Sequence, residues 1–143
     1  MPFPYFGRKA RIANLYPPAR FDTIVEPFAG SASYALHADH WTEVHKTKGW
    51  ELIEGDYSLA PDVEATWFID PPYQHVTYGY RAARRALNFA ELAEWCQARR
   101  GQTIVCEEDS ADWLPFTPLT ATTTLNNTPT VEVWWSNEKV TLF

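Results

Sequence analysis

Short apolar runs that end abruptly at turn-forming residues are the feature that most constrains how this chain can fold. Residues 21–26, 50–54, 66–69 and 102–106 are rich in β-branched, aromatic and other apolar side chains, and each run stops at proline, glycine or acidic residues. Such runs predict buried strands. Residues 8–16 and 89–100 have helical character instead. Strands that alternate with helices predict an α/β fold with a mostly parallel sheet.

The ends of the two expected helices carry recognisable signals. Pro17 stops the first, because proline cannot continue a helix. In the second, Asn88 is the expected N-cap, Glu91 its capping-box partner and Gly101 the residue that closes the helix. Residues 39–49 are polar and ambiguous, and are read as a helix that continues to Gly49.

The C-terminal third has β character throughout. Residues 119–124, 130–135 and 139–143 are expected strands, separated by Asn and Pro turns. Since strands without intervening helices pair antiparallel, we expect an antiparallel edge at this end of the sheet.

Composition excludes several classes of protein. A chain of 143 residues fits one domain, here residues 1–143. Two distant cysteines and four scattered histidines show no disulfide or zinc pattern, so no metal is expected. The chain has no apolar run of the roughly 18 residues that a membrane span needs, and it starts without a secretory signal. We therefore expect a cytoplasmic protein.

The formal net charge of −6 argues against a protein that coats nucleic acid nonspecifically, because binding to phosphates relies on Lys and Arg. Six of the twelve basic residues nevertheless form two short clusters, at residues 8–11 and 81–85. These clusters predict either a local basic face or simply solvated surfaces.

Ligands of parallel sheets bind at the carboxyl ends of the strands, so the segments just after the apolar runs are the candidate site. Three such segments are residues 26–33, 55–57 and 70–73. The most specific is Asp70-Pro71-Pro72-Tyr73, a carboxylate, two prolines and an aromatic ring straight after a strand. A plain strand-ending turn is the alternative interpretation.

Together these segments resemble the Dam-type, adenine-specific DNA methyltransferases that use S-adenosylmethionine. The segment Pro4-Tyr5-Phe6-Gly7-Arg8-Lys9 likewise resembles the Gly-Gly-Lys motif of that family, although Arg8 stands at its second glycine. The resemblance implies a Rossmann-like class I methyltransferase sheet of reduced size, mostly parallel with an antiparallel C-terminal edge. It also implies a protein of bacterial or phage type.

The resemblance implies a role for each candidate residue. Asp70 and a proline carbonyl would accept hydrogen bonds from the amine of a flipped-out adenine, and Tyr73 would stack on the base. The implied catalytic residues are Asp70, Pro71, Pro72 and Tyr73. The implied cofactor-binding residues are Tyr5, Phe6, Gly7, Lys9, Glu26, Pro27, Phe28, Gly30, Asp56 and Tyr57. Phosphates of double-stranded DNA would contact Arg81, Arg84 and Arg85.

One departure from the family affects both cofactor and DNA binding. Only 40 positions separate Gly30 from Asp70, where the family has a long insertion with a ribose-binding carboxylate and a DNA-recognition region. No separate DNA-recognition domain is therefore expected, and Asp56 is the candidate to contact the ribose. Glu107-Glu108-Asp109, after the run at 102–106, is read as a solvated loop or as an acidic edge of the pocket.

The expected function is thus methyl transfer from S-adenosylmethionine to the exocyclic amine of adenine in DNA. A second hypothesis is an inactive or partner-dependent methyltransferase remnant that acts by binding, either as a homo-oligomer or with a partner protein that supplies recognition. A third keeps the enzyme but changes the substrate to RNA or another planar amine.

Overall fold

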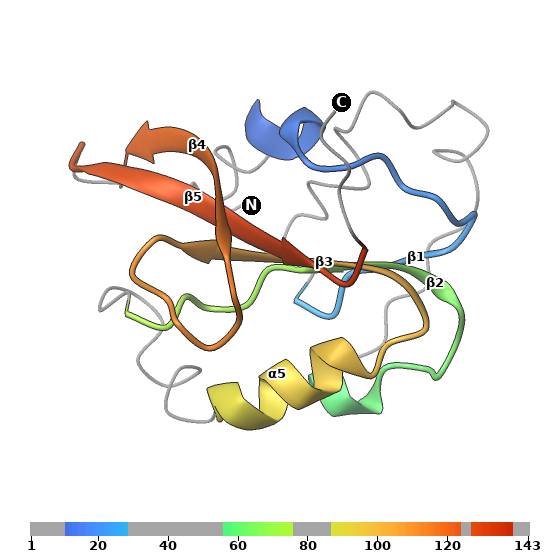
Figure 1. Cartoon of the computed structure of the whole chain (residues 1–143). Coiled ribbons are helices and arrows are strands. Elements are labelled where there is room, and N and C mark those ends of the chain that lie inside the picture. Colours follow the sequence, from blue (N-terminus) through green and yellow to red (C-terminus); the bar gives the residue numbers. More distant parts are fainter. Residues whose placement is uncertain (1–10, 29–55, 76–86, 124–126, 139–143) are drawn as a thin grey trace, which may run out of the picture.

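The described part of the chain forms one five-stranded mixed sheet (Figure 1). The structure, a computed structural model, describes residues 11–28, 56–75, 87–123 and 127–138. Its strands lie in the order β1-β2-β3-β5-β4. Their bounds are β1 Ile24–Val25, β2 Ala65–Ile69, β3 Gly101–Glu108, β4 Thr117–Thr123 and β5 Pro129–Ser136. Among the described residues, the helical elements include the α-helix α5 Phe89–Gln97 and the short 3₁₀ helices η2 Ala13–Leu15 and η3 Tyr57–Leu59.

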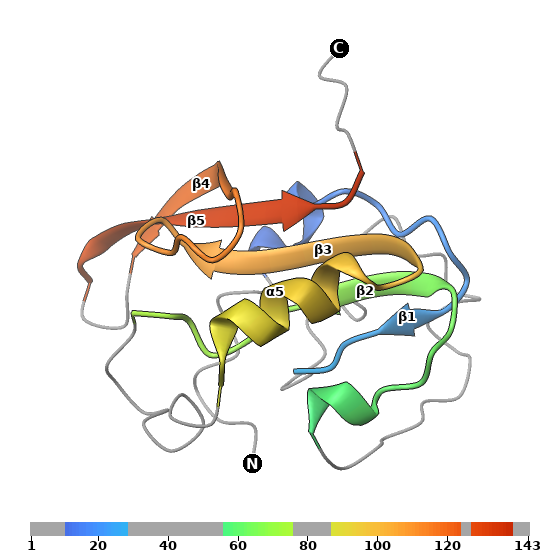
Figure 2. The same cartoon turned by 60° about the horizontal axis from the view of Figure 1, so that its bottom comes forward.

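The pairing confirms a sheet with a parallel beginning and an antiparallel C-terminal edge. β1 pairs parallel with β2, and β2 pairs parallel with β3. β5 is antiparallel to both β3 and β4, and separates them (Figure 2). The carboxyl ends of β1, β2 and β3 therefore lie at one end of the sheet.

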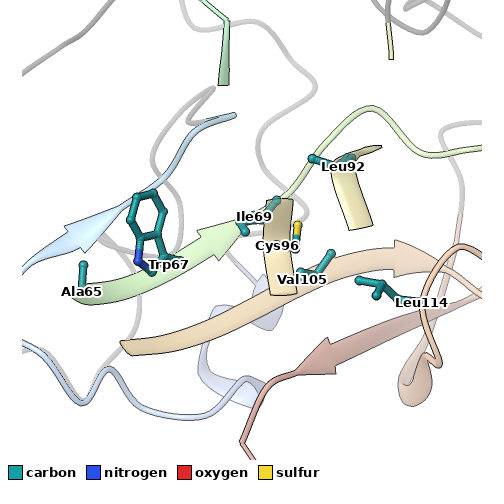
Figure 3. Packing of buried hydrophobic residues seen from close by; sticks show 7 residues of the cluster. All are labelled: Ala65, Trp67, Ile69, Leu92, Cys96, Val105 and Leu114. Carbon is teal, nitrogen blue, oxygen red and sulfur yellow. The ribbon is translucent and has the colours of Figure 1, made fainter. Parts of the chain in front are cut away.

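Two apolar cores cover the two faces of the sheet. On one face, α5 packs Leu92 and Cys96 against side chains of β2 and β3, including Ile69 and Val105 (Figure 3). On the other face, Ala13 and Tyr16 pack on Phe68 and the neighbouring β3 side chains. The near-continuous burial of β2 and β3 follows from cover on both faces.

The expected helix ends are partly confirmed. Tyr16 is extended, with φ −76° and ψ 156°, so helical structure stops directly before Pro17 as predicted. Asn88 caps α5, and its side-chain oxygen accepts from the backbone N–H groups of Ala90 and Glu91 at 3.1 and 3.2 Å. The C-terminal end of α5 was predicted wrongly, because the helix ends at Gln97.

Gly101 begins β3 and does not close α5. Its φ is +102°, and a Cβ atom built there would lie 2.2 Å from the carbonyl oxygen of Ala65 on β2. Glycine is needed here for its backbone conformation and for the close approach of two strands.

Several expected elements lie outside the described residues: the segment 39–49, the strand at 50–54, the strand at 139–143 and the start of the helix at 8–16. Within the described ranges, no helix combines the length and apolar character needed to cross a membrane.

Candidate functional site

The Asp70-Pro71-Pro72-Tyr73 segment leaves the carboxyl end of β2, as the sequence predicts. Pro71 is buried, whereas Asp70, Pro72 and Tyr73 are half-buried. In the parallel pairing Ile69 lies opposite Val105, so the segment begins beside the last residues of β3. Residues 70–74, here called the motif loop, therefore lie where ligands of such sheets bind.

Glu107, near the end of β3, holds the motif loop through its backbone. Its side chain is fully buried. The Oε1 atom accepts hydrogen bonds from the backbone N–H of Gln74 at 2.8 Å and from the indole N–H of Trp113 at 2.9 Å. The Oε2 atom accepts from the backbone N–H of Glu108 at 2.8 Å. Burial raises the pKa of Glu107 to about 7, against the opposing effect of these hydrogen bonds.

This position corrects the interpretation of residues 107–109 as a solvated loop. Glu107 and Glu108 belong to β3, and only Asp109 lies beyond it as an exposed residue. The alternation of side chains along a strand places Glu107 on the same face as Val105, under α5 and Trp113. Its carboxylate is therefore an internal acceptor.

Glu132, on β5, holds the motif loop through a side chain. Its Oε1 atom accepts a hydrogen bond from the hydroxyl of Tyr73 at 2.7 Å and another from the hydroxyl of Tyr16, also at 2.7 Å. Glu132 is 6% exposed. Burial, reinforced by the negative charges of Asp70 and Glu132, raises the pKa of Tyr73 well above its ordinary value. Tyr73 therefore stays a neutral hydrogen-bond donor.

The two carboxylates act from opposite faces of the sheet. Glu107 points to the α5 face and pairs with Val133 on β5. Because side chains alternate along a strand, Glu132 lies on the opposite face from Val133, which is the face covered by Tyr16. Gln74 adds a third tie, since its side-chain oxygen accepts from the backbone N–H of Asp112 at 3.2 Å. The C-terminal half of the motif loop is thus fixed on both sides.

An aromatic wall lies beyond the end of β1. Phe28 faces Tyr57 of η3 with ring centroids 5.6 Å apart and planes inclined by 35°. Tyr57 in turn meets Trp95 of α5 edge-on at 5.1 Å. The structure therefore brings together two of the predicted cofactor-binding residues that are 29 positions apart in the sequence.

Carboxylates accompany this wall. Glu26 is half-buried just after β1. Asp56 is exposed at the N-terminus of η3, where its carboxylate accepts from the backbone N–H of Ser58 at 2.9 Å. Hydrogen bonding to the side chain of Ser58, and then to its backbone, lowers the pKa of Asp56. Aromatic rings that can contact a purine and carboxylates that can accept from hydroxyl groups are the residue types that the predicted S-adenosylmethionine site requires. Pro27 connects Glu26 to Phe28.

The remaining predicted site residues lie outside the described residues: Tyr5, Phe6, Gly7, Lys9, Gly30, Arg81, Arg84 and Arg85. In the described part of the chain, no group of three or more His, Cys, Asp or Glu side chains is arranged to hold a metal ion.

Sequence reasoning missed Glu132 and Tyr16 and misread Glu107. The signal for Glu107 was available, because strand alternation continued from Val105 places residue 107 on the same face. No local signal identifies Glu132, since an acidic residue between two valines is typical of a solvated strand face. Its tyrosine partners lie 59 and 116 positions away.

Comparison with known proteins adds no further assignment: no protein-family model, curated protein or solved structure matches this chain.

Proposed function

We propose that this protein transfers a methyl group from S-adenosylmethionine to the exocyclic amine of adenine in DNA. The observation that carries the proposal is the motif loop itself, placed at the carboxyl end of β2 and tied to Glu107 and Glu132. The parallel beginning of the sheet and its antiparallel C-terminal edge agree with the Rossmann-like class I methyltransferase sheet that the resemblance implies.

The chemistry explains why a stiff pair of acceptors is useful here. The lone pair of an aromatic amine is delocalised into the ring, so the amine is a weak nucleophile. Asp70 and the carbonyl of Pro71 would accept hydrogen bonds from its two N–H groups and favour a pyramidal nitrogen that can attack a methyl group. The two prolines restrict the backbone between Asp70 and Tyr73, so the acceptors keep their positions.

Tyr73 would contribute its ring, with its hydroxyl held by Glu132. A ring fixed at its polar end offers an apolar face to a base at little cost in side-chain entropy. Extrusion of the base from the duplex would bring the amine within reach of the loop. Phosphates around the extruded base would be bound by Arg81, Arg84 and Arg85, as expected from the sequence.

Bound S-adenosylmethionine would supply the electrophilic methyl group, so no metal is required. As the N–CH3 bond forms, the S–CH3 bond would break, the thioether S-adenosylhomocysteine would leave, and the nitrogen would release one proton to solvent. Phe28 and Tyr57 would contact its adenine ring, while Glu26 and Asp56 would accept hydrogen bonds from its hydroxyl groups. Asp56 is the candidate for the ribose, because it is exposed next to the aromatic wall.

The test is turnover by Asp70→Ala and Asp70→Asn variants, with Asp109→Asn as the control for loss of one carboxylate nearby. We expect both Asp70 variants to lose at least about 10²-fold in methyl transfer to duplex DNA, because the acceptor acts on the reacting nitrogen. Calorimetric titration with S-adenosylmethionine should give a Kd close to that of the wild-type protein. Ordinary turnover by the Asp70 variants would refute the mechanism.

The substrate is tested alongside, with radiolabelled methyl transfer to duplex DNA, RNA and free adenosine. Transfer to DNA supports the proposal, whereas transfer only to RNA or a free nucleoside changes the substrate class. A folded wild-type chain that neither binds S-adenosylmethionine nor transfers methyl groups would overturn the proposal in favour of a binding protein.

A further inference from the structure

Two buried carboxylates outside the recognised motif converge on the motif loop. Glu107 is fully buried and Glu132 is 6% exposed. Burying an acidic side chain costs free energy unless the side chain is hydrogen-bonded. The burial of two such side chains beside one loop therefore needs an explanation. The contacts supply one, because each carboxylate accepts a hydrogen bond from the loop.

These contacts fix consecutive residues of the loop. Glu132 accepts from the hydroxyl of Tyr73, and Glu107 accepts from the backbone N–H of Gln74. The first contact comes from the face of the sheet covered by Tyr16, and the second from the face covered by α5. At its other end the loop is fixed by β2, which stops directly before Asp70. Restraint at both ends leaves the intervening prolines little freedom to move.

We infer that Glu107 and Glu132 form a two-sided clamp that sets the position of the acceptors in the motif loop. Under the proposed function, on which this role rests, both are positioning residues: they act on the amine through Asp70, Pro71 and Tyr73 and do not touch it themselves. Tyr16 belongs to the clamp, because its hydroxyl donates to the same oxygen of Glu132 that receives Tyr73.

Hydrogen exchange tests the clamp without reference to activity. In Glu107→Ala the amide of Gln74 loses its acceptor, and we expect its exchange to speed up at least about tenfold, while amides inside β2 exchange as in the wild-type protein. Tyr73→Phe removes the hydroxyl that donates to Glu132 and should speed up exchange within residues 73–75. Asp109→Asn, an exposed acidic residue just beyond β3, is the matched control and should leave the loop unchanged.

Kinetics test the positioning role. We expect Glu107→Ala and Tyr16→Phe to lower kcat for methyl transfer, by about 10- to 100-fold for Glu107→Ala, with the Kd for S-adenosylmethionine within about twofold of the wild-type value. Glu107→Gln keeps one acceptor oxygen and should recover part of the loss. A purely structural role would lower stability without this selective fall in kcat.

The outcomes separate the two proposals. Unchanged loop exchange in Glu107→Ala and Tyr73→Phe would overturn the clamp, whatever the activity. Faster exchange in a protein whose wild-type form transfers no methyl group would support the clamp and refute the proposed function. If Glu107→Ala does not fold, Glu107→Gln tests the Glu107 side of the clamp. Tyr73→Phe and Tyr16→Phe test the Glu132 side, since each removes one hydroxyl that donates to Glu132.

Discussion

At the scale of single residues, a carboxyl group illustrates how burial and hydrogen bonding compete. Glu107 receives three N–H donors, which favour its ionised form, yet complete burial raises its pKa from 4.5 to about 7. Burial therefore outweighs the hydrogen bonds. The group titrates near neutral pH in the folded chain and near its ordinary value in the unfolded chain.

A pH dependence of stability follows from this difference. Between pH 4.5 and 7 the folded protein holds a proton that the unfolded chain has released, so the free energy of unfolding falls as pH rises through this range. The contribution of Glu107 is fully present below the unfolded pKa and is lost above the folded one, at most about 3 kcal/mol. Urea denaturation of wild-type and Glu107→Gln proteins at pH 4.5 and 8 checks this.

Comparing the wild-type protein with Glu107→Gln isolates the contribution of Glu107 to the pH dependence. Other carboxyl groups, such as Asp56 with its lowered pKa, titrate equally in both proteins. We expect the wild-type protein to lose more stability than Glu107→Gln on going from pH 4.5 to 8. Equal losses in the two proteins would show that Glu107 keeps an ordinary pKa.

At the scale of elements, the parallel pairing of β2 with β3 depends on one glycine. Gly101 lies opposite Ala65 at the start of this pairing, and its φ of +102° is strained for any other residue. β3 continues from Gly101 to Glu108, so the register set at Gly101 also places Glu107 beside the motif loop.

Gly101→Ala should therefore destabilise the protein by about 2–4 kcal/mol, from backbone strain together with the clash against the Ala65 carbonyl oxygen. Chemical denaturation measures the loss. Ala121→Gly, which changes the same two residue types at an exposed position of β4, is the comparison and should cost about 1 kcal/mol or less. A Gly101→Ala protein as stable as wild type would contradict the strained geometry.

At the scale of the whole molecule, the sheet separates two cores that each contain one cysteine. Cys96 lies in the core under α5 and Cys106 in the core beside Tyr16, both fully buried. Burial raises the pKa of Cys96 to about 12. The reactive thiolate is therefore scarce at this position in the native protein.

The rate of thiol labelling should therefore report the opening of each of the two cores. We expect a water-soluble thiol reagent to modify neither cysteine of the folded protein on the timescale of minutes, and both in urea. Single variants Cys96→Ala and Cys106→Ala assign the rates to one face each. Rapid labelling of one variant under native conditions would show that the core containing its remaining cysteine opens independently of the other.

The sequence alone determined the features that arise from neighbouring residues. Apolar runs closed by turn residues predicted β2, β3 and the place of the motif loop, and Asn88 predicted the start of α5, because strand burial and helix capping act over a few positions. The end of α5 was predicted wrongly, since a glycine after a helix is ambiguous and Gly101 is needed by the contact with Ala65.

Only the tertiary structure decided which polar groups meet at the motif loop. Glu132 joins Tyr16 and Tyr73 across 116 and 59 positions, and such contacts leave no periodic signal in the chain. Phe28 and Tyr57 likewise come into ring contact only in the folded chain, although 29 positions separate them in the sequence. Local patterns thus determine where strands and loops occur, whereas the environment of a carboxyl group depends on residues that approach from other strands and faces.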